Sequence, residues 1–196
     1  DQYSEIIDDL INRNIKPMIT LHHFSHPIWF EDLGGFYQRE NVQLWVDYCQ
    51  RIFELLNAKV TDWCTVNEPE VFSIMGYHMK MFPPGKGSVF KTIRVMKNMI
   101  YAHSSAYSAL KKINPDARIG LAKNVTLFDP LRRWNLLHWI TAIILNYIWN
   151  GAVISGLKNG RMFGSKIDSA KGSFDFIGLN YYTHALTSPF LPQTTE

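Results

Sequence analysis

Cysteine is nearly absent from this sequence, with only Cys49 and Cys64 among 196 residues. Cys49 lies in a segment with helical periodicity and Cys64 in a strand-like segment, and in such places a small buried thiol is the usual role of a cysteine. The pattern disfavours a disulfide framework. It favours a reducing compartment such as the cytoplasm, and the sequence says nothing else about localisation.

An excess of one charge is also lacking. The 20 basic and 17 acidic residues leave a net charge of +3, and no run of like charge occurs. Binding to nucleic acid or to an anionic membrane usually requires a concentrated basic patch. We therefore expect neither nucleic acid nor a membrane as a partner.

No hydrophobic run is long enough for a spanning helix. The most apolar segment, residues 134–149 (WNLLHWITAIILNYIW), is shorter than the roughly 20 residues that a bilayer requires and is interrupted by Asn135, His138 and Asn146. We expect a buried or amphipathic helix there, and a role at a membrane surface is the lesser alternative. With 46% hydrophobic and 14% aromatic residues the chain can form a core, and one domain over residues 1–196 is expected.

Helix-like and strand-like segments alternate along the chain. Helical periodicity at residues 5–14, 42–56, 96–110 and 134–150 is followed each time by a strand-like run, at residues 18–21, 60–66, 118–122 and 174–179. Such alternation predicts an α/β fold with a parallel sheet and helical crossovers.

Polar side chains follow each predicted strand. They are His22 and His23, Asn67 and Glu68, Asn124, and Asn180 with Tyr182. The carboxyl ends of parallel strands meet at one edge of a sheet, which is where α/β architectures place their chemistry. The sequence therefore predicts one polar rim, and this rim is the candidate site.

Glu68 is the strongest single candidate at this rim. It follows an apolar strand and Asn67, and Pro69 cannot continue a strand ladder. Successive side chains of a regular strand point to opposite faces, so Asn67 and Glu68 can share a pocket only if the backbone departs from the pleat. The sequence leaves two interpretations open, a functional carboxylate or a cap for the next helix.

The histidines invite a metal interpretation, but His22 and His23 are neighbours on a strand and point apart. No cysteine or carboxylate completes a set at the spacing of metal ligands. We expect no metal and no cofactor, with one of these two histidines facing a ligand and the other packing against a helix. His103 lies on the apolar face of its helix and is expected to be a hydrogen-bonded core residue.

Other acidic residues are candidates for a second catalytic carboxylate. Glu31, Asp32 and Asp129 fall in predicted loops, and each is a candidate second carboxylate. Glu70 is interpreted as a charge at the start of a helix. Asp175 opens its strand, hence lies on the opposite rim, and is excluded from the chemistry.

Five stretches carry a resemblance to a known family. They are residues 20–27 (TLHHFSHP) with 29–30 (WF) and 34–35 (GG), residues 65–69 (TVNEP), 82–85 (FPPG), 114–120 (NPDARIG) and 175–182 (DFIGLNYY). These stretches, their order along the chain and the spacing between them resemble those of glycoside hydrolase family 1, the β-glucosidase family. The resemblance implies a (βα)8 TIM-barrel type fold, present here as a four-stranded parallel half barrel with helical crossovers that corresponds to strands three to six.

The resemblance also implies roles for individual residues. Glu68 would be the general acid/base of a retaining mechanism. His23 and Asn67 would hydrogen-bond hydroxyls of the sugar, and Asn180 and Tyr182 would lie beside the nucleophile. The implied activity is that of a β-glucosidase-like retaining β-glycosidase, acting on O-glycosidic bonds of small β-glucosides or related sugars.

The chain departs from the family pattern in two respects. Phe24 stands where many members have tryptophan, which would alter stacking on the sugar without removing it. The Thr-Glu-Asn-Gly stretch that carries the family's nucleophile does not occur, so we expect the isolated chain to be impaired or inactive. The alternative is a truncated, inactive half barrel that binds sugars or self-associates through apolar edge strands at Met18 and Phe176.

Overall fold

The computed structural model of this chain describes residues 2–189 and 192–195. Four parallel strands form the sheet in the order β1 (Met18–His22), β2 (Asp62–Asn67), β3 (Arg118–Pro130) and β6 (Phe176–Thr187). The strand β7 (Pro192–Thr195) adds to β6 in antiparallel orientation. The predicted four-stranded parallel sheet is confirmed, with one antiparallel strand added at its edge.

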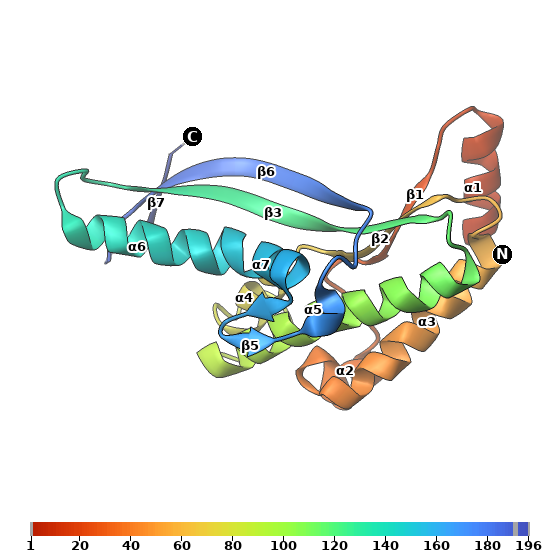
Figure 1. Cartoon of the computed structure of the whole chain (residues 1–196), viewed down its shortest axis with the longest axis horizontal. Coiled ribbons are helices and arrows are strands. Elements are labelled where there is room, and N and C mark those ends of the chain that lie inside the picture. The colour runs from red at the N-terminus through yellow and green to blue at the C-terminus, as the bar shows by residue number, and fades with distance from the viewer. Residues whose placement is uncertain (1, 190–191, 196) are drawn as a thin grey trace.

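The connections are mostly helical, as predicted. The helices are α1 (Gln2–Asn12), α2 (Ile28–Asp32), α3 (Val42–Leu56), α4 (Pro69–Tyr77), α5 (Val89–Ile113), α6 (Leu136–Asn146) and α7 (Ala152–Asn159), with short helical turns η1 (Gly35–Tyr37), η2 (Arg39–Asn41), η3 (Tyr147–Gly151) and η4 (Asp168–Ala170). A small hairpin joins β4 (Arg161–Met162) to β5 (Ser165–Lys166). In Figure 1, α5, α6 and α7 lie along one side of β3 and β6.

The core forms where α3 and α5 pack on β2. All six residues of β2 are buried, as expected for a central strand of a parallel sheet. Phe53 of α3 packs against Trp63 of β2, with ring centroids 4.8 Å apart and the rings tilted by 54°. Cys49 and Cys64 are both buried and unpaired, which confirms the expected small buried thiols.

Two strands are longer than predicted. The sequence pattern ends them near residues 122 and 179, whereas β3 continues to Pro130 and β6 to Thr187. The two strands pair with each other from Gly120 and Phe176 onward, so their backbone N–H and C=O groups are hydrogen-bonded to each other. The strands can therefore continue where the sequence no longer shows an apolar strand pattern. Asn124 and Asn180 consequently lie within strands, and their predicted position just past strand ends was wrong.

One of the two sheet edges also differs from the prediction. Among the described strands β1 pairs with β2 alone, and Met18 is 55% exposed, so this edge is open as expected. The other edge is partly covered, because His184 to Thr187 of β6 pair with β7.

Candidate active site

The backbone leaves the regular pleat where Asn67 and Glu68 occur. A register shift between Cys64 and Asn67 interrupts the pairing of β2 with β3. Glu68 then adopts a left-handed conformation with φ 46° and ψ 65°, and its N–H donates to the carbonyl of Ala122 at 2.8 Å. A non-glycine residue in this region is strained, and such strain concentrates at functional sites.

The carboxylate of Glu68 is buried and held by amides from two neighbouring strands. Its Oε1 accepts from Asn180 Nδ2 at 2.7 Å and from Asn124 Nδ2 at 3.3 Å, and only 5% of the residue is exposed. Asn180 Nδ2 also lies 3.2 Å from Asn67 Oδ1. The side chain makes no capping bond to α4, so the interpretation of Glu68 as a helix cap was wrong. Asn67, Glu68 and Asn180 therefore form one cluster, joined by Asn124.

A buried ion pair lies directly behind this cluster. Glu70 lies in the first turn of α4, as predicted, but it is fully buried, which the sequence did not predict. Its Oε1 accepts from Lys123 Nζ at 3.0 Å and from the N–H of Asn124 at 2.7 Å. Lys123 Nζ also donates to the carbonyls of Asn124 and Trp149, the latter at 2.6 Å. The pair thus fixes the backbone of Asn124, whose side chain in turn contacts Glu68.

Burial dominates the electrostatics of this pair. It raises the pKa of Glu70 from 4.5 to about 7, although the charge of Lys123 opposes the rise. It also lowers the pKa of Lys123, against the opposing charge of Glu70. This pair was not predicted from the sequence, where its one signal is a single lysine inside an apolar strand, immediately before Asn124.

The remaining predicted site residues are His23, Phe24 and Tyr182. His23 is exposed and its ring contacts Phe24, with centroids 5.0 Å apart. Phe24 contacts Phe82 at 5.5 Å. Tyr182 is 74% exposed and lies at a bulge, because Tyr181 and Thr183 pair with consecutive residues of β3. Among the described residues, no hydrogen bond joins His23, Phe24 or Tyr182 to Glu68, so their sugar-binding roles stay predictions.

The other candidate carboxylates lie in regular elements and not in loops as predicted, Glu31 and Asp32 in α2 and Asp129 in β3. Asp32 is exposed. Glu31 accepts from Lys86 Nζ at 2.6 Å and from the hydroxyl of Tyr77 at 3.3 Å. Asp129 lies 2.8 Å from His184 Nε2 and is about half exposed. Asp175 accepts from the N–H of Ile119, at the opposite end of the sheet, as predicted.

His22 and His103 are both buried and pack in the protein interior. His22 is 2% exposed and its ring meets those of Phe36, Trp45 and Phe72 edge-on. This agrees with the expectation that one histidine of the pair packs inward. His103 lies 2.6 Å from Thr65 Oγ1 through Nδ1 and 2.7 Å from the carbonyl of Ser173 through Nε2, which confirms the hydrogen-bonded core residue.

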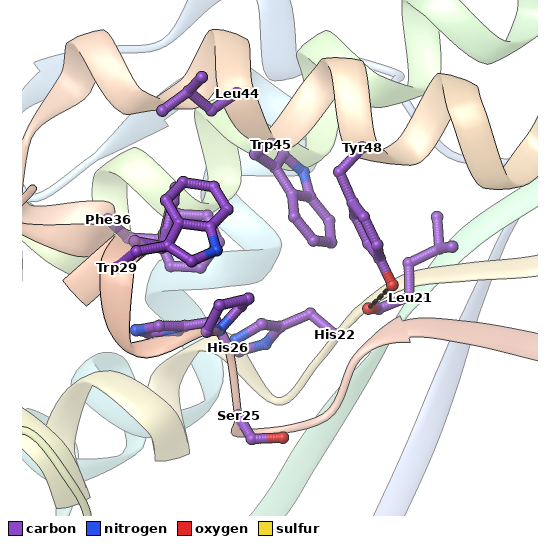
Figure 2. A pocket seen from close by; sticks show the side chains of 11 residues that line it. Leu21, His22, Ser25, His26, Trp29, Phe36, Leu44, Trp45 and Tyr48 are labelled. Atoms are coloured by element: carbon purple, nitrogen blue, oxygen red, sulfur yellow. Dashed lines mark hydrogen bonds between the residues drawn. The ribbon is translucent and has the colours of Figure 1, made fainter.

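A cavity of about 200 Å³ lies beside His22 (Figure 2). Leu44, Trp45 and Tyr48 of α3 form one wall, and residues that follow β1 form the other. Burial, together with His26 and His23, lowers the pKa of His22 to about 3, so its ring is neutral. The walls are chiefly aromatic and Glu68 is not among them. Within the described part of the chain, no three His, Cys, Asp or Glu side chains converge as metal ligands would.

Comparisons with known proteins agree with this geometry. Residues 1–155 match the model of glycosyl hydrolase family 1. A 1,4-β-D-glucan glucohydrolase of Thermotoga neapolitana is 28% identical over 93% of this chain and 47% of its own length. The chain therefore spans about half the length of the curated relatives it matches.

Solved structures extend the likeness to the fold. A β-glycosidase from Pyrococcus horikoshii superposes with a TM-score of 0.88 at 32% identity, over 98% of this chain and 46% of that one. The β-glucosidase from Thermotoga maritima in complex with glucoimidazole gives a TM-score of 0.91 at 24% identity, over 99% and 48%. The sheet with its helical crossovers is therefore half of a TIM barrel, and the chain belongs to glycosyl hydrolase family 1.

Proposed function

We propose that this chain is the acid/base-bearing part of a retaining β-glycosidase that acts on β-glucosides or related small sugars. The observation that carries the proposal is the buried carboxylate of Glu68, held by Asn180 and Asn124 at the end of β2 in a family 1 chain. Relatives named as β-glucosidases support the substrate class. A buried carboxyl group beside amide donors can pass one proton to a leaving group and later take one from water.

In the retaining mechanism two carboxyl groups act on opposite sides of the glycosidic bond. Glu68 would protonate the glycosidic oxygen while a second carboxylate, about 5 to 5.5 Å away, attacks the sugar carbon. Glu68 would then act as base toward the water that releases the sugar. His23 and Asn67 would bind sugar hydroxyls, and Phe24 would stack on the ring.

Among the residues that the structure describes, no second carboxylate is joined to the Glu68 cluster. Glu70 is committed to Lys123, and Glu31 and Asp129 are held by other partners. The sequence contains no Thr-Glu-Asn-Gly stretch. We therefore propose that hydrolysis requires a carboxylate that this chain does not supply, and that the chain alone turns over slowly or not at all.

The test is hydrolysis of aryl β-glucosides by the chain alone and by the chain mixed with a polypeptide that carries the other barrel strands and their glutamate. We expect turnover only in the mixture. In the mixture Glu68→Gln should lower the rate by about 10²- to 10⁴-fold for a substrate with a poor leaving group. The loss should be much smaller for a dinitrophenyl glucoside, whose leaving group needs no proton.

Three results would contradict the proposal. Equal losses for both leaving groups would show that Glu68 is not the proton donor. Robust turnover by the chain alone, abolished by Glu68→Gln, would show that a nucleophile is present after all. Sugar binding without turnover in the mixture would favour the inactive sugar-binding alternative.

A further inference from the structure

The helical stretch Leu136–Asn159, formed by α6, η3 and α7, is bound to β3 through its polar side. By length and composition this stretch is long and apolar enough to cross a membrane, contrary to the expectation that no run was long enough. Asn146 and Asn150 tie it to the strand, because their amides bond both backbone groups of Phe128 and of Thr126 respectively. The apolar side of the stretch therefore faces away from β3, where its residues are exposed.

Trp149 lies in η3, where five residues adopt π-helical geometry. Turns of this kind are rare and occur frequently at functional sites. The carbonyl of Trp149 accepts from Lys123 Nζ at 2.6 Å, and its indole Nε1 donates to Asn124 Oδ1 at 2.8 Å. Thr126 Oγ1 donates to the same oxygen at 3.3 Å. Two donors thus meet one end of the Asn124 amide, and the indole supplies the shorter bond.

The indole decides which way the amide of Asn124 points. The two ends of an asparagine amide have nearly the same shape, but one end only accepts hydrogen bonds and the other only donates them. An indole N–H can only donate, so the end that faces Trp149 is the oxygen, whereas the hydroxyl of Thr126 could donate or accept and selects neither end. The opposite end is then Nδ2, which donates to Glu68 Oε1 at 3.3 Å. A reversed amide would set two N–H donors against each other at Trp149 and two oxygens against each other at Glu68.

The backbone of Asn124 is fixed as well as its side chain. Its N–H donates to Glu70 Oε1 at 2.7 Å, and its carbonyl accepts from Lys123 Nζ. Only 8% of Asn124 is exposed, so water does not compete effectively for these bonds. The position of Nδ2 is therefore determined before any substrate binds, as a preorganised site requires.

The two carboxyl oxygens of Glu68 consequently differ. Oε1 accepts from Asn124 Nδ2 and from Asn180 Nδ2, the latter at 2.7 Å, and no residue in the described part of the chain donates to Oε2. A carboxyl oxygen has two lone pairs, so two N–H donors leave Oε1 without a lone pair for a proton. The proton of the neutral carboxyl group therefore belongs on Oε2.

We propose that Trp149 is a positioning residue for the proton donor, and that through Asn124 it confines the transferable proton of Glu68 to Oε2. This inference rests on the proposed function and deepens it. In the first step the proton leaves Oε2 for the glycosidic oxygen while the bond from that oxygen to the sugar carbon breaks and the second carboxylate bonds to the carbon. In the second step Oε2 takes a proton from water while the water oxygen bonds to the same carbon and the carboxylate leaves. Oε1 keeps its two amide donors throughout.

Side-chain amide NMR of the ¹⁵N-labelled chain tests this geometry without any turnover. The Nδ2 signals of Asn124 and Asn180, assigned with Asn124→Asp and Asn180→Asp, should each show a pH-dependent shift that disappears in Glu68→Gln. Trp149→Phe keeps an aromatic ring and removes the indole N–H, so the Asn124 shift should be largely lost and the Asn180 shift retained. Trp139→Phe is the matched control and should retain both shifts, because the indole of Trp139 donates to the carbonyl of Arg133.

Kinetics of the mixture with the other barrel strands test the consequence for proton transfer. Trp149→Phe should lower kcat/KM about tenfold for a glucoside with a poor leaving group, which is the worth of one hydrogen bond to a charged group. It should leave kcat/KM nearly unchanged for a dinitrophenyl glucoside, whose leaving group needs no proton. Thr126→Val removes the longer of the two bonds to Asn124 Oδ1 and should give a smaller loss in the same direction. Trp139→Phe should leave both values unchanged.

An Asn124 shift that is the same in Trp149→Phe and in the unmodified chain would overturn the inference. So would equal losses for both leaving groups in Trp149→Phe while Glu68→Gln discriminates between them, because a merely structural role would affect both substrates alike. Failure of Glu68→Gln itself to discriminate would overturn the proposed function, and the proton-transfer role of Trp149 with it, even where the NMR shifts follow the expectation.

Discussion

Replacing Lys123 by methionine tests the buried pair behind Glu68 most directly. The substitution keeps the length of the side chain and removes its ammonium group, which donates to Glu70 Oε1 and to the carbonyls of Asn124 and Trp149. Lys123 is 1% and Glu70 0% exposed, so water cannot replace the lost donor. Breaking a buried pair by removing one partner costs about 3–5 kcal/mol of unfolding free energy, and we expect Lys123→Met to fall in this range at pH 8.

The loss of unfolding free energy caused by Lys123→Met should be smaller at acidic pH. The pKa of Glu70 is about 7 beside Lys123 and would be higher without it, because burial is then unopposed. At pH 5 Glu70 is protonated in both proteins, so little charge attraction is lost. The remaining cost comes from two carbonyls and one carboxyl left without a donor, at about 1 kcal/mol each.

Urea unfolding followed by tryptophan fluorescence at pH 5 and pH 8 measures both values. Lys112→Met, at an exposed lysine on α5, is the matched control and should change stability by less than about 0.5 kcal/mol. The reasoning is refuted if the two variants are equally stable, or if Lys123→Met costs more at pH 5 than at pH 8.

Two further predictions concern pH. The folded pKa of Glu70 of about 7 exceeds its ordinary value of 4.5, so its stabilising contribution is complete below pH 4.5 and is lost as the pH rises through 7. Glu70→Gln should remove this contribution, and urea titrations should show the difference between the unmodified chain and the variant changing by about 3 kcal/mol over this window. A difference that does not vary with pH would contradict the assignment. For His103, burial lowers the pKa from 6.5 to about 4, so its contribution is complete above pH 6.5 and is lost as the pH falls through 4. His103→Gln should flatten the decline in stability over that range by about 3 kcal/mol, and an unchanged slope would exclude His103 as its source.

The sequence predicted the elements well because each has a local cause. The apolar residues of α3 recur with helical spacing, and β2 is a buried run that ends at Asn67, two residues before Pro69. The alternation of such segments is enough to predict a parallel sheet. The need for a break in the pleat at Glu68 also followed from the alternation of side chains along a strand, and the bulge and the left-handed Glu68 provide that break.

The extent of β3 and β6 had no local cause. Beyond residue 122 the two strands persist because each satisfies the backbone of the other, and because Asn146 and Asn150 bind the free side of β3. None of these partners is close in the sequence. Asn124 and Asn180 therefore reach Glu68 from inside strands, which no pattern of single segments predicts.

The sequence by itself determined the family and the parallel sheet and pointed to Glu68 as the strongest candidate carboxylate, because short motifs and periodicity encode local geometry. Tertiary structure alone decided which groups surround it. Glu70 and Lys123 are 53 residues apart, and only the pairing of β2 with β3 brings them together and removes them from water. Likewise the composition of residues 134–149 shows an apolar helix, but only its hydrogen bonds to β3 determine that the apolar side faces outward.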